Sequence, residues 1–388
     1  MYTESEVLDF VREEDVKFVR LAFFDVKGKQ KNISIMADQL HRAFELGISF
    51  DASAIEGFES PDKSDLFLHP DPTTLSVLPW RPNTGKVCRM FCNIKYPDGT
   101  PYGKDCRTML KNAIKYAKEK YNLTLSFGPE VEFYLFKLNE AGEPTNIPFD
   151  NAGYMDIAPE DKGENIRRDI CFTLESMGIT PEASHHEEGP GQNEIDFRYS
   201  DALTAADNAA TFKWIVRTRA ASNGLYADFA PKPIEGKAGS GFHINVSLSD
   251  ESKMPNAIAG ILKHAEELTY FLNPTENSYN RLGECKAPKY ICWGNQNRST
   301  MVRVPATKKH SRLEIRSADP ECNPYLAFTL IIYAILDGIE NNLVPPAAVE
   351  ENLFAAKEKG DIKVLPDTLD LAKKIADDSE FVKKVLNY

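Results

Sequence analysis

Four stretches of the chain alternate apolar and polar residues with the period of two that is typical of β-strands. They cover residues 130–136, 184–197, 242–247 and 313–316. In the first, Glu130 and Glu132 share one face, because successive side chains of a strand point to opposite faces. In the second, Glu187 and Glu194 flank a Gly-Pro-Gly turn, which would fold its flanks into a hairpin and bring both carboxylates together.

The other two stretches add a histidine, an acid and an arginine to these carboxylates. His243 lies on the polar face of the third stretch, and Glu314 and Arg316 lie on that of the fourth. Acids on a buried sheet face must be paired or bound to a metal. Several carboxylates and one histidine suit a hard cation, Mg²⁺ or Mn²⁺, better than a structural zinc. An ordinary half-solvated strand explains any one stretch equally well, but all four together favour a cation site.

Helical periodicity and turn residues predict an α+β fold with two domains. Helices are expected at 3–13, 37–46, 107–120, 163–177, 204–222, 256–272 and, buried nearly all round, 324–336. Strands are expected at 18–24, 33–36, 74–79, 86–94, 123–138 and 298–303, with a long polar loop reaching about residue 73. A Pro-Asp-Gly-Thr-Pro linker at 97–101 separates a small domain at 1–100 from a larger domain at 101–388.

Composition narrows the function classes. The 388 residues carry a formal net charge of -12, which gives no electrostatic support for binding nucleic acid. The seven cysteines are scattered and form no C-x-x-C pair, so they indicate reduced thiols in the cytoplasm. No signal sequence follows Met1, and the longest apolar stretch, residues 325–336, is too short to span a membrane. We therefore expect a cytoplasmic protein without a membrane or nucleic-acid partner.

The basic residues point to phosphate or carboxylate chemistry. None of the four Gly-Lys pairs belongs to a P-loop, and the glycines at 239 and 241 lack the third glycine of a dinucleotide fingerprint. Arginines cluster late in the chain, at positions 281, 298, 303, 312 and 316. Arginine forks match carboxylate and phosphate groups, and arginines beside divalent cations suit phosphoryl transfer. The residues alone thus indicate an ATP-type phosphate handled over a carboxylate-lined cation site.

Several long motifs follow one another in order along the chain. They are Phe50-Asp-x-Ser-x-Ile-Glu-Gly-Phe58, Gly128-Pro-Glu-x-Glu-Phe133, Ser184-His-His-Glu…Gly-Gln-Asn-Glu-Ile-Asp-Phe197, Gly239-Ser-Gly-x-His243, Asn273-Pro-Thr-x-Asn-Ser-Tyr279, Asn297-Arg-Ser299 and Asn323-Pro-Tyr-Leu-Ala327. In these motifs the chain closely resembles glutamine synthetase of the bacterial and archaeal type I. The resemblance runs from the N-terminus to about residue 386. It implies a β-grasp N-terminal domain and a catalytic domain built on a curved antiparallel sheet.

The resemblance also implies a site with two or more divalent ions. Its motifs place Glu132, Glu187 and Glu194 on one metal, and Glu130, His243 and Glu314 on the second. Positions that hold glutamate are matched by Gly239, Arg281, Glu284, Arg298 and Arg316. Positions around ATP are matched by Glu182, Phe197, Asn245, Ser247, Arg298, Arg303 and Arg312. Structural ion pairing is the alternative for Arg281 and Arg316, and His185, His186 and His264 are expected to be structural or surface residues.

The implied reaction is ATP-dependent ligation of L-glutamate with ammonia through γ-glutamyl phosphate. Catalytic roles fall to Asp51, which resembles the ammonium-binding acid, and to Arg298 and Arg316. In the loop after Arg281, however, Lys286 stands where the family has a site-closing glutamate. A lysine there would repel ammonium unless Glu284 compensates, so ammonium is expected to be used poorly.

That altered loop keeps two other functions open. One is a γ-glutamyl ligase for an organic amine, and the other is a catalytically degenerate structural or regulatory oligomer. The second is disfavoured because all six presumed metal ligands are acids or histidine.

Assembly and regulation are implied by the same resemblance. Asp51 serves a neighbouring subunit's site in this family, so a hexameric ring is expected. The chain stops at Tyr388, short of an extension that clasps two rings, and weaker stacking into a dodecamer is expected. Ser60 and Phe354 stand where relatives have a feedback arginine and a modified tyrosine, which predicts weak glutamine inhibition and no adenylylation.

Overall fold

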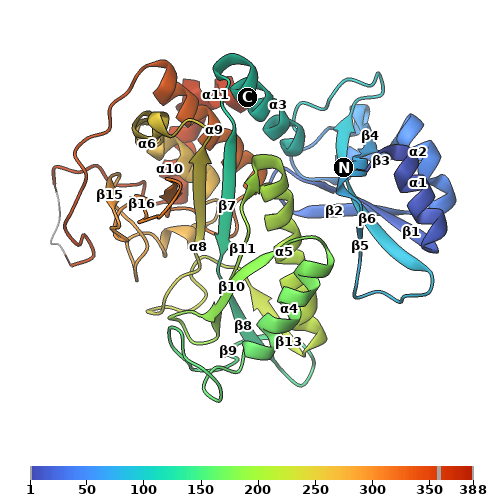
Figure 1. Ribbon diagram of the computed structural model, residues 1–388, viewed down its shortest axis with the longest axis horizontal. Helices are drawn as coiled ribbons and strands as arrows, with labels where there is room; N and C mark the ends of the chain where they lie inside the picture. Colours follow the sequence, from blue (N-terminus) through green and yellow to red (C-terminus); the bar gives the residue numbers. More distant parts are fainter. Residues whose placement is uncertain (1, 356–359, 387–388) are drawn as a thin grey trace. The chain divides into compact units, whose positions relative to one another are not determined.

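The computed structural model of the chain describes residues 2–355 and 360–386 (Figure 1). The expected domain ranges also include the remaining residues, which lie outside the described part. Contacts along the chain define two units, one reaching Asn112 and including Glu175–Gly178, the other comprising Ala113–Leu174 and the residues from Ile179 onward. The division falls within a helix, so the boundary expected at residue 100 stays a prediction.

The first unit combines one mixed sheet with short helices. Its strands and helices are α1 (Glu4–Glu13), β1 (Val16–Phe24), β2 (Gln30–Met36), α2 (Leu40–Leu46), β3 (Ile48–Asp51), β4 (Asp65–Pro70), β5 (Ser76–Val77) and β6 (Lys86–Lys95). The strand order is β2-β1-β6-β4-β3, with β1 parallel to β6. Thr3 and Glu6 form the capping box expected at the start of α1. Val7, Leu21, Leu40 and Met90 contribute to the core beneath the sheet.

Strand β4 lies inside the region expected to be a long polar loop, so that expectation is wrong. Leu66 and Leu68 alternate with more exposed residues and are fully buried. The strand pairs with β3 on one side and β6 on the other. Only two apolar residues carry the strand pattern, and the surrounding prolines and aspartates hid it at the level of sequence.

The second unit contains two sheets flanked by helices. Its first half comprises α3 (Cys106–Tyr121, which begins in the first unit), β7 (Leu125–Val131), β8 (Phe133–Leu138), β9 (Pro144–Pro148), α4 (Glu164–Ser176), β10 (Pro181–His186), β11 (Gln192–Phe197), β12 (Ser200–Asp201), α5 (Ala202–Ser222) and β13 (Leu225–Asp228). Its second half comprises β14 (Phe242–Leu248), α6 (Met254–Lys263), α7 (Ala265–Leu272), α8 (Glu276–Tyr279), β15 (Trp293–Asn295), β16 (Val302–Val304), β17 (Leu313–Ile315), α9 (Pro324–Glu340), α10 (Leu369–Asp378) and α11 (Glu380–Leu386). One sheet has the order β10-β11-β8-β13 and the other β12-β7-β14-β17-β16-β15.

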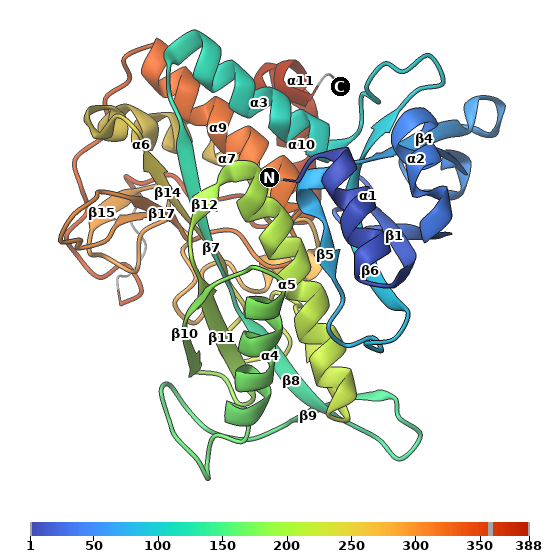
Figure 2. The ribbon, with the colours of Figure 1, turned by 45° about the vertical axis from the view of Figure 1, so that its right-hand side comes forward.

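The single strand expected at 123–138 is two strands, and the break falls at Glu132. β7 belongs to the sheet with β14, whereas β8 belongs to the sheet with β11 (Figure 2). The backbone N–H of Glu132 donates to the carbonyl of Gly241 and continues the pairing of β7 with β14, whereas the chain from Phe133 onward pairs with β11 and β13. The alternation of residues continues through the break, so the sequence pattern did not reveal it.

Two further elements differ from expectation. The helix expected at 256–272 is interrupted at His264, whose ring bonds Glu267 and Asp337, and it forms α6 and α7. The strand expected at 298–303 is reduced to β16, because Asn297 Oδ1 accepts the N–H of Ser299 and holds a turn there.

Helices α6 and α9 cross so closely that two glycines are required. A Cβ on Gly260 would lie 2.0 Å from the carbonyl oxygen of Ala334, and one on Gly338 would lie 2.1 Å from that of Asn256. Asn323 caps α9 and Pro324 begins it, as expected, although the helix continues to Glu340. Helix α5 packs along β7 and β13 (Figure 2).

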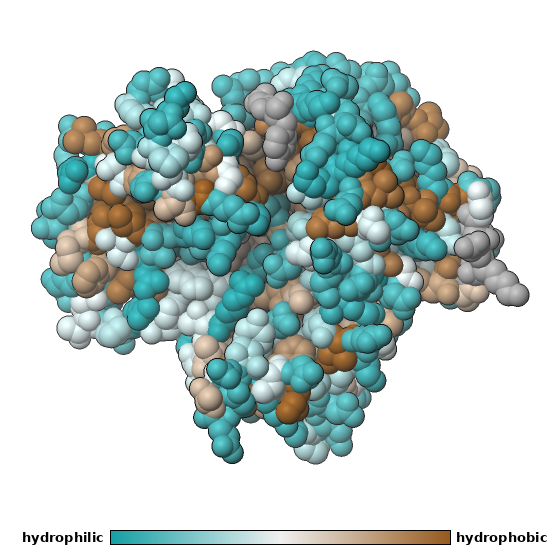
Figure 3. Space-filling view, turned by 180° about the vertical axis from the view of Figure 1, so that it is seen from behind, coloured by the Kyte–Doolittle hydropathy of each residue, from teal (hydrophilic) through white to brown (hydrophobic). Residues whose placement is uncertain are grey.

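The surface, the helices and the cysteines bear on the expectation of a protein without membrane spans or disulfides. On the face shown in Figure 3, apolar residues form separate patches interrupted by polar side chains. Within residues 2–355 and 360–386, no helix combines the length and apolar character that a membrane crossing demands. All seven cysteines are free thiols. The cytoplasmic location stays a prediction.

Candidate active site

In the sheet that contains β7, β14 and β17, strand register brings the acids to one face. Glu130 on β7 lies opposite His243 on β14, and Glu314 on β17 lies opposite Asn245. His243 Nδ1 lies 3.5 Å from Glu130 Oε2 and 3.9 Å from Glu314 Oε1. The expected trio of Glu130, His243 and Glu314 therefore converges, with ligand atoms within 4.8 Å of one another.

Two arginines hold the carboxylate of Glu314. Arg316 Nη1 donates to Oε1 at 2.6 Å, and Arg303 Nη1 donates to Oε2 at 2.7 Å. Burial of Glu314 favours the neutral acid, but Arg316, His243 and Arg303 outweigh it and lower the pKa of Glu314 to about 2. This carboxylate is ionised at any physiological pH.

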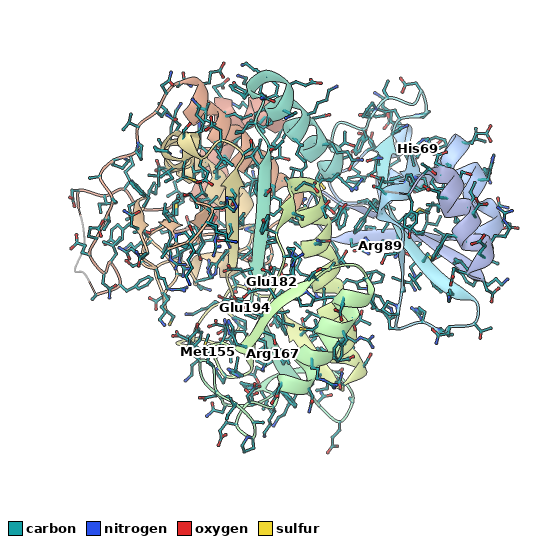
Figure 4. All side chains as sticks on the ribbon, viewed as in Figure 1. His69, Arg89, Met155, Arg167, Glu182 and Glu194 are labelled. Atoms are coloured by element: carbon teal, nitrogen blue, oxygen red, sulfur yellow. The ribbon has the colours of Figure 1, made fainter. Side chains whose placement is uncertain are left out.

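The hairpin that was expected between Glu187 and Glu194 forms through β10 and β11, whose labelled residues Glu182 and Glu194 appear in Figure 4. Its turn is closed by a hydrogen bond from the Glu187 N–H to the Gln192 carbonyl at 2.8 Å. Glycine is required at position 191, where φ is +71° and a Cβ would lie 2.8 Å from the Leu135 carbonyl.

The acids of the β10–β11 hairpin lie close to those of the sheet of β7, β14 and β17 at Glu132, where β7 ends. Glu132 and Glu194 form a group with His243, while Glu187 and Glu194 form a group with His185, each with ligand atoms within 4.8 Å. Glu194 thus links Glu132 to Glu187. Glu132 is held by two donors, the Gly241 N–H at 2.8 Å and Gln192 Nε2 at 3.0 Å.

No arginine neutralises the hairpin acids within hydrogen-bonding distance among the described residues. Burial, followed by the charge of Glu132, raises the pKa of Glu187 to about 8 and that of Glu194 well above its usual range. Such crowding of carboxylates is the arrangement that a bound cation relieves.

Two residues near the acids were missed or assigned differently from sequence. Asp196 groups with Glu130 and Glu194, and its buried Oδ1 has no hydrogen-bond partner among the described residues. The signal was present, because Asp196 lies two residues beyond Glu194 on the same strand face. His185 was expected to be structural or on the surface, yet its Nδ1 lies 3.6 Å from Glu187 Oε1.

His186 behaves as the structural residue that was expected. It is fully buried and bonds Asp150 Oδ1 at 2.9 Å and the Glu187 carbonyl at 2.6 Å. Burial opposes its charge, but these bonds outweigh that effect and raise the pKa of His186. Asp150 and Asp161 form a group with His186. Because Asp150 bonds His186 and Asp161 pairs with Arg167, the protein itself already balances the charge of both acids.

Two of the three arginines expected to hold glutamate, Arg281 and Arg316, are buried and bonded to the protein. Arg281 Nη1 and Nη2 donate to the carbonyls of Ser317 at 2.9 Å and Arg316 at 3.2 Å. Arg316 pairs with Glu314 as described, and its Nε donates to the Arg298 carbonyl at 3.1 Å. The ion pair of Arg316 fits the structural alternative, whereas Arg281 bonds backbone carbonyls, and the substrate role of both arginines stays a prediction. Gly239 lies beside Arg281, because a Cβ there would lie 2.9 Å from Arg281 Cγ.

The residues expected around the nucleotide are only partly gathered. Asn245 lies beside the expected metal ligands, because it donates to Glu130 Oε1 at 2.8 Å and accepts from Arg312 Nε at 2.9 Å. Ser247 follows two residues later on β14 and is half-buried. Phe197 is buried in the core at the end of β11, whereas Glu182 and Arg298 are exposed. Glu182 Oε1 lies 3.7 Å from Arg198 Nε, and within the described part of the chain Glu182 belongs to none of the groups of acids.

The altered loop after Arg281 is held against the hairpin. Lys286 Nζ pairs with the carboxylate of Glu188, next to Glu187. Three residues of the loop, Gly283, Cys285 and Lys286, have positive φ. Glu284 is exposed on the same loop. In the first unit, Asp51 is also exposed, and it accepts hydrogen bonds from the N–H and hydroxyl of Ser53.

Comparison with known proteins identifies the family. A model of the glutamine synthetase catalytic domain matches residues 103–388, and a model of the glutamine synthetase β-grasp domain matches residues 15–97. The chain belongs to the glutamine synthetase family. Its α+β fold with a β-grasp N-terminal domain is confirmed.

Relatives support this at nearly full length. Glutamine synthetases of Methanosarcina mazei and Clostridium saccharobutylicum are each 45% identical, with 99% of this chain and 90% and 91% of theirs covered. A solved structure described as a GmaS/ADP complex is 29% identical with a TM-score of 0.89, covering 98% of this chain and 92% of that one. Glutamine synthetase of Plasmodium falciparum, at 22% identity and a TM-score of 0.86 over 100% of this chain and 95% of that one, shares the fold.

Family membership defines the reaction. The chain is an ATP-dependent glutamate–ammonia ligase, and the close relatives do not favour ligation of an organic amine. The family uses ATP and a divalent metal, and the acidic groups described above could hold such an ion.

Proposed function

We propose that the face shared by β7, β14, β17 and the β10–β11 hairpin binds two divalent cations, Mg²⁺ or Mn²⁺, and is the catalytic centre of glutamate–ammonia ligation. One cation takes Glu132, Glu187 and Glu194, and the other takes Glu130, His243 and Glu314. The observation that carries this proposal is convergence. All six residues belong to three overlapping groups, and the ligand atoms within each group lie within 4.8 Å of one another. Glu194 connects Glu132 with Glu187, which share no group among the described residues.

The donor set fits hard divalent cations. Five carboxylates and one imidazole supply oxygen and nitrogen ligands, without a cysteine. Burial and repulsion from Glu132 raise the pKa values of Glu187 and Glu194, and a bound cation would relieve this cost. Asp196, with its unpartnered buried oxygen, is placed to bind a water or a donor at the edge of the same site.

The proposed chemistry is two successive substitutions. The glutamate side-chain carboxylate attacks the γ-phosphorus of ATP, which breaks the bond to ADP and forms γ-glutamyl phosphate. Ammonia then attacks the γ-carbonyl carbon, phosphate leaves with the electron pair of the broken bond, and the nitrogen gives up a proton. When bound, the cations would offset the charge of the two anions as they approach each other.

Arginines complete the proposed charge balance. Arg303 and Arg316 already donate to Glu314 and would stand beside the transferred phosphoryl group. The glutamate subsite is assigned to Gly239, Arg281, Glu284, Arg298 and Arg316. The nucleotide subsite is assigned to Glu182, Phe197, Asn245, Ser247, Arg298, Arg303 and Arg312.

We also propose a hexameric ring in which Asp51 completes the site of a neighbouring subunit. Support comes from the family and from the exposed position of Asp51, whose Oδ1 accepts two hydrogen bonds from Ser53 at 2.9 and 2.6 Å. Mixing Asp51→Ala and Glu132→Ala subunits tests this. Partial recovery of activity in the mixture is expected, and two variants that stay inactive together would contradict it.

The proposed function is tested by measuring phosphate release with ATP, Mg²⁺ and glutamate over a panel of amines. Release that requires ammonium and Mg²⁺, with glutamine as product, is expected. Turnover with an organic amine but not with ammonium would overturn the assignment, and so would turnover that survives removal of divalent cations.

A further inference from the structure

Asp319 is a fully buried acid that is not one of the proposed metal ligands. It lies in the segment between β17 and α9 and has no exposed surface. Its Oδ2 accepts from Asn273 Nδ2 at 3.0 Å, and its Oδ1 accepts from the Glu321 N–H at 3.0 Å. The side chain of Ser278 bonds the same carboxylate. A buried charge with this many donors is an organised feature of the fold.

The same network holds the guanidinium of Arg281. Asn273 Nδ2 donates both to Asp319 and to the Ser317 carbonyl, at 2.8 Å for the latter, and that carbonyl also accepts from Arg281 Nη1. The backbone N–H of Arg281 donates to the Ser278 carbonyl at 3.1 Å. Asp319 is therefore tied to Arg281 through the Ser317 carbonyl on one side and through helix α8 on the other.

Arg281 lies beside His243, one of the proposed metal ligands. A Cβ on Gly241 would lie 2.6 Å from His243 Nε2 and 3.0 Å from Arg281 Nη2, so the guanidinium and the imidazole flank the same glycine. Only 2% of Arg281 is exposed, and its guanidinium donates to uncharged carbonyls. A buried charge requires a compensating charge nearby. Asp319 supplies the larger part of it and Glu132 adds to it, whereas Arg316 repels Arg281.

We propose that Asp319 is a positioning residue for glutamate, which fixes the orientation of Arg281 through Asn273, Ser278 and the Ser317 carbonyl and balances its charge. The inference rests on the proposed role of Arg281 in holding glutamate. Asp319 itself touches no substrate in this assignment. Its loss should weaken glutamate binding while leaving ATP binding and the metal ligands in place.

The ionisation of Asp319 gives the proposal a second readout. Burial, opposed by Arg281, raises the pKa of Asp319 to about 6. The other charged or titratable groups around it are Tyr279 after Ser278, Lys213 on α5, and Glu321 and Cys322 on its own segment. Burial raises the pKa values of Tyr279 and Cys322 far above 6, so neither titrates in that range. Acidification through pH 6 should therefore raise the KM for glutamate in the wild type.

The test compares Asp319→Asn with Glu321→Gln, an acid of the same segment whose backbone N–H bonds Asp319. For Asp319→Asn we expect the KM for glutamate to rise about tenfold, the order of one hydrogen bond to a charged group, with the KM for ATP within about twofold. The rise in glutamate KM between pH 7 and pH 5.5 should be lost as well. Glu321→Gln should match the wild type. An unchanged glutamate KM in Asp319→Asn overturns the proposal, and so does an equal rise in both KM values.

Two further variants separate the possible failures. Asn273→Ala keeps the carboxylate but removes its link to Ser317, and it should raise the glutamate KM in the same direction, which keeps the test open if Asp319→Asn does not fold. Arg281→Lys tests the subsite itself. If Arg281→Lys raises the glutamate KM and both network variants do not, the positioning role is wrong and the proposed function stands. If Arg281→Lys leaves that KM unchanged, the assignment of Arg281 to glutamate is wrong.

Discussion

The two halves of the proposed metal site differ in how their charge is balanced. Around Glu314 the protein supplies its own cations, because Arg303 and Arg316 bond both carboxylate oxygens and lower the pKa to about 2. Around Glu187 and Glu194 the described residues leave the acids to repel one another, and the pKa values rise. A cation at Glu314 must compete with arginines, whereas a cation at the hairpin relieves a cost already present in the fold. The hairpin half should therefore bind its cation more tightly and displace protons in doing so.

The largest effect is expected from removing a hairpin ligand. Glu187→Ala should lower phosphate release by more than 100-fold, since the loss of outer-shell partners alone costs about 10–100-fold in metal sites. The metal-free variant should unfold at an unchanged or higher temperature, because one of the repelling carboxylates is gone. Steady-state assays at saturating Mg²⁺ with thermal unfolding check both, and Glu143→Ala, an exposed acid between β8 and β9, serves as the matched control. Retained turnover would remove Glu187 from the metal site.

The pH dependence of the metal-free protein sharpens the contrast. Because the folded-state pKa of Glu187 is raised to about 8, its contribution to stability is fully present below about pH 4.5 and is lost as the pH rises through 8. Glu314, with a lowered pKa, contributes in the opposite direction, and its stabilisation is lost only as the pH falls toward 2. The unfolding temperature of the metal-free protein should thus fall from pH 6 to pH 8.5, and added Mg²⁺ should raise it again. A Glu187→Gln variant with the same pH profile as the wild type would refute this origin.

Arg316→Ala should make the charge balance around Glu314 resemble that around the hairpin acids. Without Arg316, the pKa of Glu314 would rise, because Arg316 is the largest of the charges that lower it. If Arg316 also holds glutamate, the KM for glutamate should increase about tenfold or more, the equivalent of roughly 1.5–3 kcal/mol for a hydrogen bond to a charged group, and more than the KM for ATP. Initial-rate measurements with each substrate varied in turn decide this. An effect confined to ATP would assign Arg316 to the nucleotide.

The smallest effect is expected at the loop after Arg281. Lys286 and Glu188 form an ion pair with side chains 60% and 35% exposed, so the pair contributes about 1 kcal/mol or less. Glu188→Gln would leave Lys286 unpaired beside the hairpin and should raise the KM for ammonium by up to about fivefold, less at high salt. Lys286→Glu should improve ammonium use, in line with the expectation that ammonium is used poorly. If neither variant changes the ammonium KM, Lys286 does not influence the amine subsite, and Glu284 becomes the next residue to test.

The site could be predicted from sequence because strand alternation and the glycine turn determine which side chains share a face. Glu130, His243 and Glu314 converge through register alone. The break at Glu132 could not be predicted, since it depends on a change of partner strand, from β14 to β11 and β13, which lie far away along the chain. The contacts of Arg281 with backbone carbonyls were hidden for the same reason, because side-chain pattern carries no information about carbonyl partners. Asp196 was visible in the alternation and was overlooked.

The central claim is that the hairpin half is the tighter cation site and is coupled to protons. Titration of Mn²⁺ into the metal-free protein, followed by calorimetry in two buffers of different ionisation enthalpy at pH 7, tests it most directly. We predict two classes of site, in which the tighter one releases protons and disappears in Glu187→Gln, while the weaker one binds with little proton release. A single class of site, or a tight class that persists without proton release in Glu187→Gln, would contradict the account.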